Sequence, residues 1–161
     1  MAILDANEII FQAFEPKVQN RFVMLIDNIP SFMIKNVKAP TFTDNVIKLD
    51  HINTYRKIRG KREWEDITMT LYDPITPSGA QAVMEWARAS YESVTGRDGY
   101  SDFYKKDLTL NILGPVGDII GEWVIKGAFL TNGDFGQYDW TSDESVEVAI
   151  TVSMDYCILN Y

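Results

Sequence analysis

Residues 145–156, SVEVAITVSMDY, alternate between apolar and polar side chains along their length. Every second position from Val146 is apolar, and the positions between them, from Glu147 onward, carry small or acidic residues. Successive side chains of a strand point to opposite faces, so this stretch predicts a strand with one dry and one wet face, the longest in the chain. Residues 64–72 repeat the pattern, with Ile67, Met69 and Leu71 set against polar neighbours.

Around these two segments, further strands are predicted at 21–27, 32–37, 46–52, 106–113 and 119–130, with a turn at 114–118 and a loop at 132–138. The unbroken apolar run 22–26 is typical of a central buried strand. One substantial helix is predicted at 77–95, with Thr76 as N-cap, Pro77 in the first turn and Gly96 as the stop. The fold class is therefore mainly β (α+β), a β-sandwich or part-barrel with one packed helix.

A second, shorter helix is predicted at 5–15. Asp5 can cap it, and its apolar positions follow helical spacing at Ala6, Ile9, Ile10, Ala13 and Phe14. An isolated helix of this length is marginal in water, so it must dock on its own domain or on a neighbour. No repeat or linker divides the chain, so residues 1–161 are expected to form a single domain.

Composition excludes several classes of function. The 161 residues carry a net charge of −8, which opposes general nucleic-acid binding because that binding depends on lysine and arginine. Cys157 is the single cysteine, so no internal disulfide is possible and a reducing compartment such as bacterial cytoplasm fits. The longest apolar run, 22–26, is far shorter than a membrane-spanning helix, so no membrane insertion is expected.

Catalytic motifs are missing from the sequence. His51 and Cys157 are the only histidine and cysteine, too few for a zinc site built from such ligands. Neither a phosphate-binding loop nor a serine nucleophile elbow occurs, and the many neighbouring carboxylates are typical of solvated loops. We therefore expect no catalytic residues, no cofactor, no metal and no enzymatic activity.

Residues 53–62 form a basic segment in an acidic chain. We interpret it as an extended loop or hairpin arm that contacts an acidic surface on a neighbouring copy, although a solvated loop or a phosphate contact would also fit. Its basic residues are Arg56, Lys57, Arg59, Lys61 and Arg62.

Several segments together resemble the tail tube proteins of contractile-tailed, T4-like bacteriophages. They are 20–26, 62–73 leading into Met84-Glu85-Trp86, 125–133, Asp139-Trp140, and the terminal strand ending at Tyr156. The resemblance extends over nearly the whole chain, although Leu130 stands where related sequences tend to have proline. It also implies a relationship to the tubes of type VI secretion systems and of extracellular contractile injection systems.

The resemblance implies a structural subunit that forms homohexameric rings, in which the inner strands of six copies close one shared β-barrel. Rings would stack into a tube inside a sheath, with baseplate and tape-measure proteins as further partners, and DNA would pass through the lumen without sequence-specific binding. The location implied is the virion tail, assembled in the cytoplasm of the host bacterium.

On this chain, the resemblance implies a channel lined by Thr68, Thr70, Glu147, Thr151, Ser153 and Asp155, an acidic and hydroxyl-rich wall that repels DNA. It implies that the 53–62 arm reaches a neighbouring subunit or ring. The alternatives within this class are the tube of a non-phage injection device and a tube-initiating baseplate protein. A different class, a small ligand-binding β-barrel, would require a closed single-chain barrel and a monomeric protein.

Overall fold

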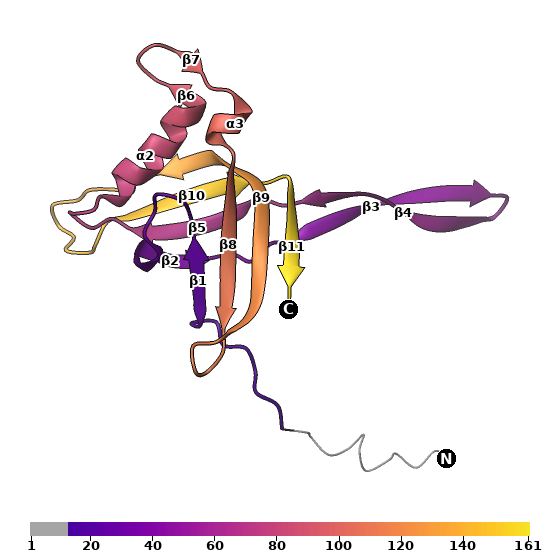
Figure 1. The fold of residues 1–161 in the computed structure, drawn as a ribbon. Helices are drawn as coiled ribbons and strands as arrows, with labels where there is room; N and C mark the ends of the chain where they lie inside the picture. Colours follow the sequence, from indigo (N-terminus) through magenta and orange to yellow (C-terminus); the bar gives the residue numbers. More distant parts are fainter. Residues whose placement is uncertain (1–12) are drawn as a thin grey trace.

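The computed structural model describes residues 13–161 (Figure 1). The helix predicted at 5–15 lies outside the described residues except for its last three positions, which form neither helix nor strand. Among the described residues, no helix has the length and apolar character needed to cross a membrane.

Seven strands form one sheet. Six of them follow one another in the hydrogen-bonded order β1–β8–β9–β10–β5–β2, and the seventh, β11, pairs with β9 beside this path. Their bounds are β1 Phe22–Leu25, β2 Ile34–Val37, β5 Ile67–Tyr72, β8 Lys106–Leu113, β9 Ile119–Asp134, β10 Glu147–Ser153 and β11 Tyr156–Asn160. The pairings are antiparallel. The path begins at β1 and ends at β2 without these two strands pairing, so the sheet folds over as a part-barrel that stays open along one side.

The long strand β9 joins the two layers of this part-barrel. Its first part pairs with β8 and β11, and its last part, from Phe129 onward, pairs with β10. The change of pairing partners along β9 comes directly after Gly127, which has φ +66°. A Cβ at this position would also overlap the carboxylate of Asp155. Glycine is therefore required by both backbone conformation and space at the bend.

The core lies between the two layers and under the main helix. Ile67, Met69 and Leu71 of β5 pack with alternate residues of β10, with Leu108 and Ile125 from the facing layer, and with side chains of α2 (Gly79–Ser90). The alternating pattern of 64–72 and 145–156 thus predicts the inward faces of these two strands correctly.

The main helix is shorter than the predicted range 77–95 at both ends. Ser78, not Thr76, is the N-cap, and its hydroxyl accepts a hydrogen bond from the Gln81 amide at 3.3 Å. At the other end the chain turns into a small hairpin, β6 (Tyr91–Glu92) with β7 (Arg97–Asp98), followed by α3 (Ser101–Tyr104). Val94, which falls within the predicted helix range, lies in this turn and is exposed.

Two strand predictions were also wrong. The run 22–26 is not a central strand, because β1 is at the end of the strand path and pairs only with β8. The segment 145–156 does not form one strand, since Met154 and Asp155 separate β10 from β11, and the longest strand is β9. The chain leaves one layer for the other at this break, beside the Gly127 bend, where the Asp155 amide donates to the Lys126 carbonyl at 3.0 Å.

A long two-stranded hairpin projects from the body. It consists of β3 (Phe42–His51) and β4 (Thr54–Trp64), which pair with each other and with no other described strand (Figure 1). A short 3-10 turn, η1 (Ser31–Met33), precedes β2 on the body.

Candidate assembly surfaces

A polar face covers the outside of the β5–β10–β9 layer. Thr68 lies directly opposite Thr151, and Thr70 opposite Ala149, in the β5–β10 ladder. The structure therefore brings Thr68, Thr70, Glu147 and Thr151 onto one face, opposite the buried one. Sequence reasoning missed other members of this face, namely Asn36 of β2, Tyr72 of β5, and Asn132 and Asp134 of β9.

Lys35 of β2 also belongs to this face, and it forms an ion pair and hydrogen bond with Glu147. This hydrogen bond raises the pKa of Lys35, and its ammonium also lies 5.7 Å from the centre of the Tyr72 ring. The two partners are 112 residues apart in sequence, so no local pattern could have revealed them. The expected excess of negative charge on this face is therefore offset at Glu147.

Ser153 and Asp155 lie toward the other end of this layer. Ser153 is opposite Phe129 in the β10–β9 ladder, and Asp155 follows in the break before β11. Lys105 donates to the Asp155 carboxylate at 2.9 Å. Both acids predicted to line a channel are thus already paired with a lysine of the same chain.

The predicted arm 53–62 falls almost entirely in β4, and β3 supplies its second strand. Residues 42–64 hold six basic and three acidic side chains, a net charge of +3 in a chain whose total is −8, which leaves −11 for the remainder. The five predicted arm residues, Arg56, Lys57, Arg59, Lys61 and Arg62, are all exposed.

The base of the hairpin is held by a charged cluster. Arg62 forms a two-point contact with Asp44, at 2.7 and 2.9 Å, and its guanidinium stacks on the Phe42 ring at 3.9 Å. Arg59 adds a looser ion pair with Asp44 at 3.8 Å. The hydrogen bond from Arg62 holds the pKa of Asp44 below its usual range. A bulge beside this cluster, at Gly60 opposite Asn45, shifts the register of the outer part.

Beyond the bulge, the two faces of the hairpin differ. One carries Lys48 and Lys57, whose ammonium groups lie 5.1 and 5.5 Å from the centre of the Tyr55 ring. The other carries Ile47 opposite Ile58, with Leu49 alongside, all three nearly half exposed. Two-stranded hairpins are marginally stable alone, and this apolar strip is left partly exposed by residues 13–161.

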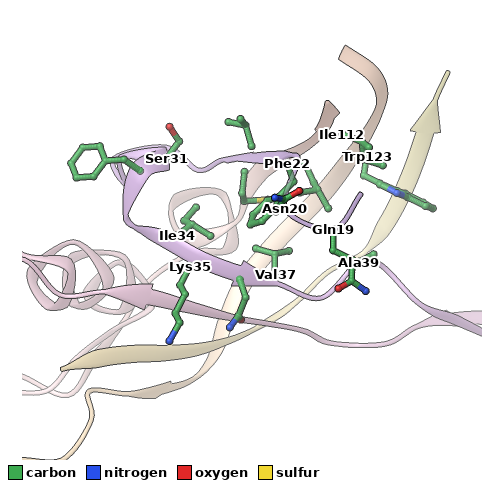
Figure 2. Close-up of a pocket in the computed structure, with 15 residues that line it drawn as sticks. Gln19, Asn20, Phe22, Ser31, Ile34, Lys35, Val37, Ala39, Ile112 and Trp123 are labelled. Carbon is green, nitrogen blue, oxygen red and sulfur yellow. The ribbon is translucent and has the colours of Figure 1, made fainter. Parts of the chain in front are cut away.

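The open side of the part-barrel forms an apolar groove of about 990 Å³ between β1 and β2, which we call the seam (Figure 2). Phe22 of β1 and Ile34 and Val37 of β2 line its walls. Gln19 and Ala39 lie together at one end, and Ser31 lies at the other. Its walls are continuous with the hydrophobic core.

The described residues contain no cluster of three or more histidine, cysteine or acidic side chains that could hold a metal ion. His51, the single histidine, is the last residue of β3. Burial raises the pKa of the Cys157 thiol to about 11, and this thiol lies 2.9 Å from the Met154 sulfur. A protonated, half-buried thiol is a weak nucleophile.

No protein-family model and no curated protein sequence matches this chain. Solved structures do match. A chain from the cryo-EM structure of the anti-feeding prophage cap (the AFP tube terminating cap) aligns with a TM-score of 0.75 and 18% identity, covering 98% of this chain and 99% of the other. A chain from the PVC sheath–tube complex of an extracellular contractile injection system, in its extended state, aligns with a TM-score of 0.71, 19% identity and the same coverage.

A more distant match is a type six secretion system protein, with a TM-score of 0.52 and 12% identity, covering 88% of this chain and 83% of the other. At these identities the likeness concerns the fold. It extends over the whole domain, the open part-barrel and the flanking helix included. The chain therefore has the fold of the tube and cap components of contractile injection systems, as its resemblance to tail tube proteins predicts.

Proposed function

We propose that this protein is a structural subunit of the inner tube of a contractile tail, and specifically of a contractile phage tail through which DNA is ejected. The observation that carries the proposal is the fold match over 98% of the chain to components of tube and cap assemblies. In this role the copies form homohexameric rings that stack head to tail, a heterologous contact that extends without closing. Sheath, baseplate and tape-measure proteins are its further partners.

The projecting hairpin supports this assembly role. Its net charge of +3 complements the −11 of the remaining chain, so an arm from one copy is attracted to the body of the next. Its exposed apolar strip, formed by Ile47, Leu49 and Ile58, gives the contact a hydrophobic component. The predicted arm residues are then inter-subunit contacts.

The polar face on β5 and β10 supports the role of channel wall for Thr68, Thr70, Glu147, Thr151, Ser153 and Asp155. Hydroxyl groups dominate it, and the two predicted acids, Glu147 and Asp155, have lysine partners in the same chain, while Asp134 of β9 lies opposite Ala149 as a further acid. We therefore propose a wall that is less acidic than the one expected from sequence. Such a wall passes DNA because it offers no unpaired cation to hold phosphates.

The three alternatives from sequence differ in their support. The likeness to a tube terminating cap favours a second candidate, a component at one end of the tube, such as a cap or the tube-initiating baseplate protein. A single-chain ligand-binding barrel requires closure, whereas the strand path of the described residues ends at β1 and β2, which do not pair with each other. A tube of a non-phage injection device has the same architecture and stays an alternative.

The test is electron microscopy and light scattering of the purified chain across a range of concentrations. A tube subunit forms rings that stack into long hollow tubes, whereas an end component stops at single rings. A protein that stays monomeric at every concentration, also when preformed tubes are added as seeds, contradicts both.

A charge-reversal pair tests the arm within that assay. Arg56→Glu with Lys61→Glu removes two arm charges that have no ion-pair partner within residues 13–161, so the hairpin itself is left intact. We expect assembly to require at least about tenfold more protein, most clearly at low salt. The control, Arg88→Glu with Arg97→Glu beside α2, makes the same change in net charge away from the arm.

A further inference from the structure

The seam between β1 and β2 exposes side chains that belong to the core, and the chain carries a segment suited to cover them. We infer that residues 5–15 of a neighbouring copy lie in the seam as an amphipathic helix, in which residues 13–15, which form neither helix nor strand in the single chain, become helical on binding. This inference rests on the proposed self-assembly, and it assigns the seam an occupant and a partner.

The seam has the composition of a helix-binding groove. Met24 and Ile34 form part of its lining and are almost fully buried, while Phe22, Val37 and Trp123 pack against the core only in part. Polar side chains surround this apolar lining at Gln19, Asn20, Ser31 and Asn36. An apolar groove with a polar rim is the usual partner of a helix with one apolar face.

The dimensions of the segment and the seam agree. β1 and β2 have four residues each, which corresponds to about 13 Å of strand. A helix over residues 5–15 would be about 16 Å long and roughly 10 Å across. Sheet layers pack about 10 Å apart, so a helix can lie along the open side where a further strand is missing.

The chemistry of the segment also suits the seam. Its apolar face, predicted from sequence, includes Ile9 and Ile10, and its three charged residues, Asp5, Glu8 and Glu15, are all acidic. The only charged side chain among those that line the seam is Lys35, which is already paired with Glu147. Binding would thus depend on apolar burial, with the acidic residues of the segment left in solvent.

The path of the chain favours a neighbour's seam over its own. The segment joins the body beside the seam, since Gln19 and Asn20 line it, after a turn in which the Arg21 amide donates to the Val18 carbonyl at 3.2 Å. Residues 13–18 are exposed and run away from the body (Figure 1). In a ring, copies are held at high local concentration, so a short helix that is marginal alone can bind the adjacent copy.

A matched pair of variants tests the inference. Ile10→Asp places a charge on the predicted apolar face, whereas Gln12→Asp adds the same charge outside it. Urea unfolding of both variants, below the concentration of assembly, separates any loss of monomer stability from a loss of assembly. We expect Ile10→Asp to raise the protein concentration needed for ring formation at least about tenfold, because an unpaired charge would have to be buried. Gln12→Asp should assemble like the unmodified protein.

Cysteine crosslinking identifies the copy that is bound. In a Cys157→Ser background, Ile10→Cys with Val37→Cys is oxidised after assembly, and the products are separated under denaturing conditions. A ladder of covalent multimers supports the inference. A product that remains one chain, with the crosslink inside it, places the segment in its own seam and overturns the inference.

The outcomes separate this inference from the proposed function. Normal rings from Ile10→Asp, or rings of the double-cysteine protein without any crosslink, would overturn the seam assignment and leave the tube role standing. Failure of the unmodified protein to form rings would instead count against the tube role itself.

Discussion

Two antiparallel strand pairs in this molecule both carry large aliphatic side chains but differ in how far those side chains are exposed to solvent. In the β5–β10 pair, the inward-facing side chains are at most 2% exposed, namely Ile67, Met69, Leu71, Val148, Ile150 and Val152. In the β3–β4 hairpin, Ile47, Leu49 and Ile58 are 46–49% exposed. The first pair is stabilised inside one chain by the facing layer and α2. The second contacts the core at its base through Trp64, but within residues 13–161 no other strand pairs with it. Under the proposed function, its exposed apolar residues would contribute to stability chiefly when another copy covers them.

The largest expected effect tests this difference directly. Leu71→Ala removes a fully buried side chain at the centre of the core, so it should lower the free energy of unfolding by about 3 kcal/mol. Ile58→Ala removes a similar side chain from the hairpin and should lower it by less than about 0.5 kcal/mol in the monomer. Urea unfolding of both variants, below the concentration of assembly, provides the measurement.

The same two variants should rank in the opposite order when assembly is measured in place of monomer stability. Ile58→Ala should weaken ring formation or stacking, while Leu71→Ala should assemble normally wherever it is folded. Equal losses of monomer stability in the two variants would show that the hairpin is stabilised within its own chain and would contradict the comparison.

A second prediction concerns the bend that gives the body its two layers. Gly127→Ala forces a residue with a Cβ into φ +66° and against the Asp155 carboxylate, so we expect a loss of about 2 kcal/mol in the free energy of unfolding. Gly133→Ala, later in the same strand, is the control, because its Cβ would meet only ordinary contacts with the Phe135 ring at 3.8 Å. A similar loss from both would mean that β9 is sensitive to any side chain and not to its bend.

A third prediction uses Cys157 as a reporter of the body. Burial raises the pKa of its thiol to about 11, so its reaction with a thiol reagent at pH 8 should be roughly a hundredfold slower in the folded protein than in urea. Leu71→Ala should speed this reaction by opening the core more often, whereas the arm variant Arg56→Glu with Lys61→Glu should leave it unchanged. Faster labelling in the arm variant would indicate that the hairpin and the body unfold together.

The sequence predicts the body better than the way its parts connect. Period-two alternation in 64–72 and 145–156 identifies the inward faces because each pattern is local. The break at Asp155 and the continuation of β9 to Asp134 depend on how two distant segments meet at Gly127, which no local pattern contains. The helix boundary is similar, because α2 ends at Ser90 and Tyr91 is already extended, as the first residue of a hairpin that pairs with 97–98, five residues or more further along the chain.

The candidate surfaces show the same limit. The basic character of residues 53–62 is visible in sequence, but β3 was predicted only from residue 46 and as an ordinary strand. Val46, Ile47 and Leu49 have the composition of a buried strand, and only the structure shows that nothing in the described chain covers them. Likewise, Glu147 could be placed on the polar face by alternation, while its partner Lys35 comes from a strand 112 residues away.

The smallest expected effect is a pH dependence confined to the base of the hairpin. The hydrogen bond from Arg62 lowers the pKa of Asp44 in the folded hairpin. The Asp44 carboxylate therefore stabilises the folded hairpin fully at any pH above its usual pKa of about 4. This stabilisation is lost as the pH falls through the lower pKa of the folded state. An NMR titration of the Asp44 carboxyl carbon should therefore show a midpoint below 4, and Arg62→Gln should return it toward the usual value. Asp107 also has a lowered pKa, through its hydrogen bond with Lys126 on the body, and it serves as the internal reference. If Arg62→Gln moves both titration midpoints, the hairpin and the body are electrostatically coupled. If it moves only the Asp44 midpoint, the hairpin is electrostatically independent of the body, as an arm available for a neighbouring copy would be.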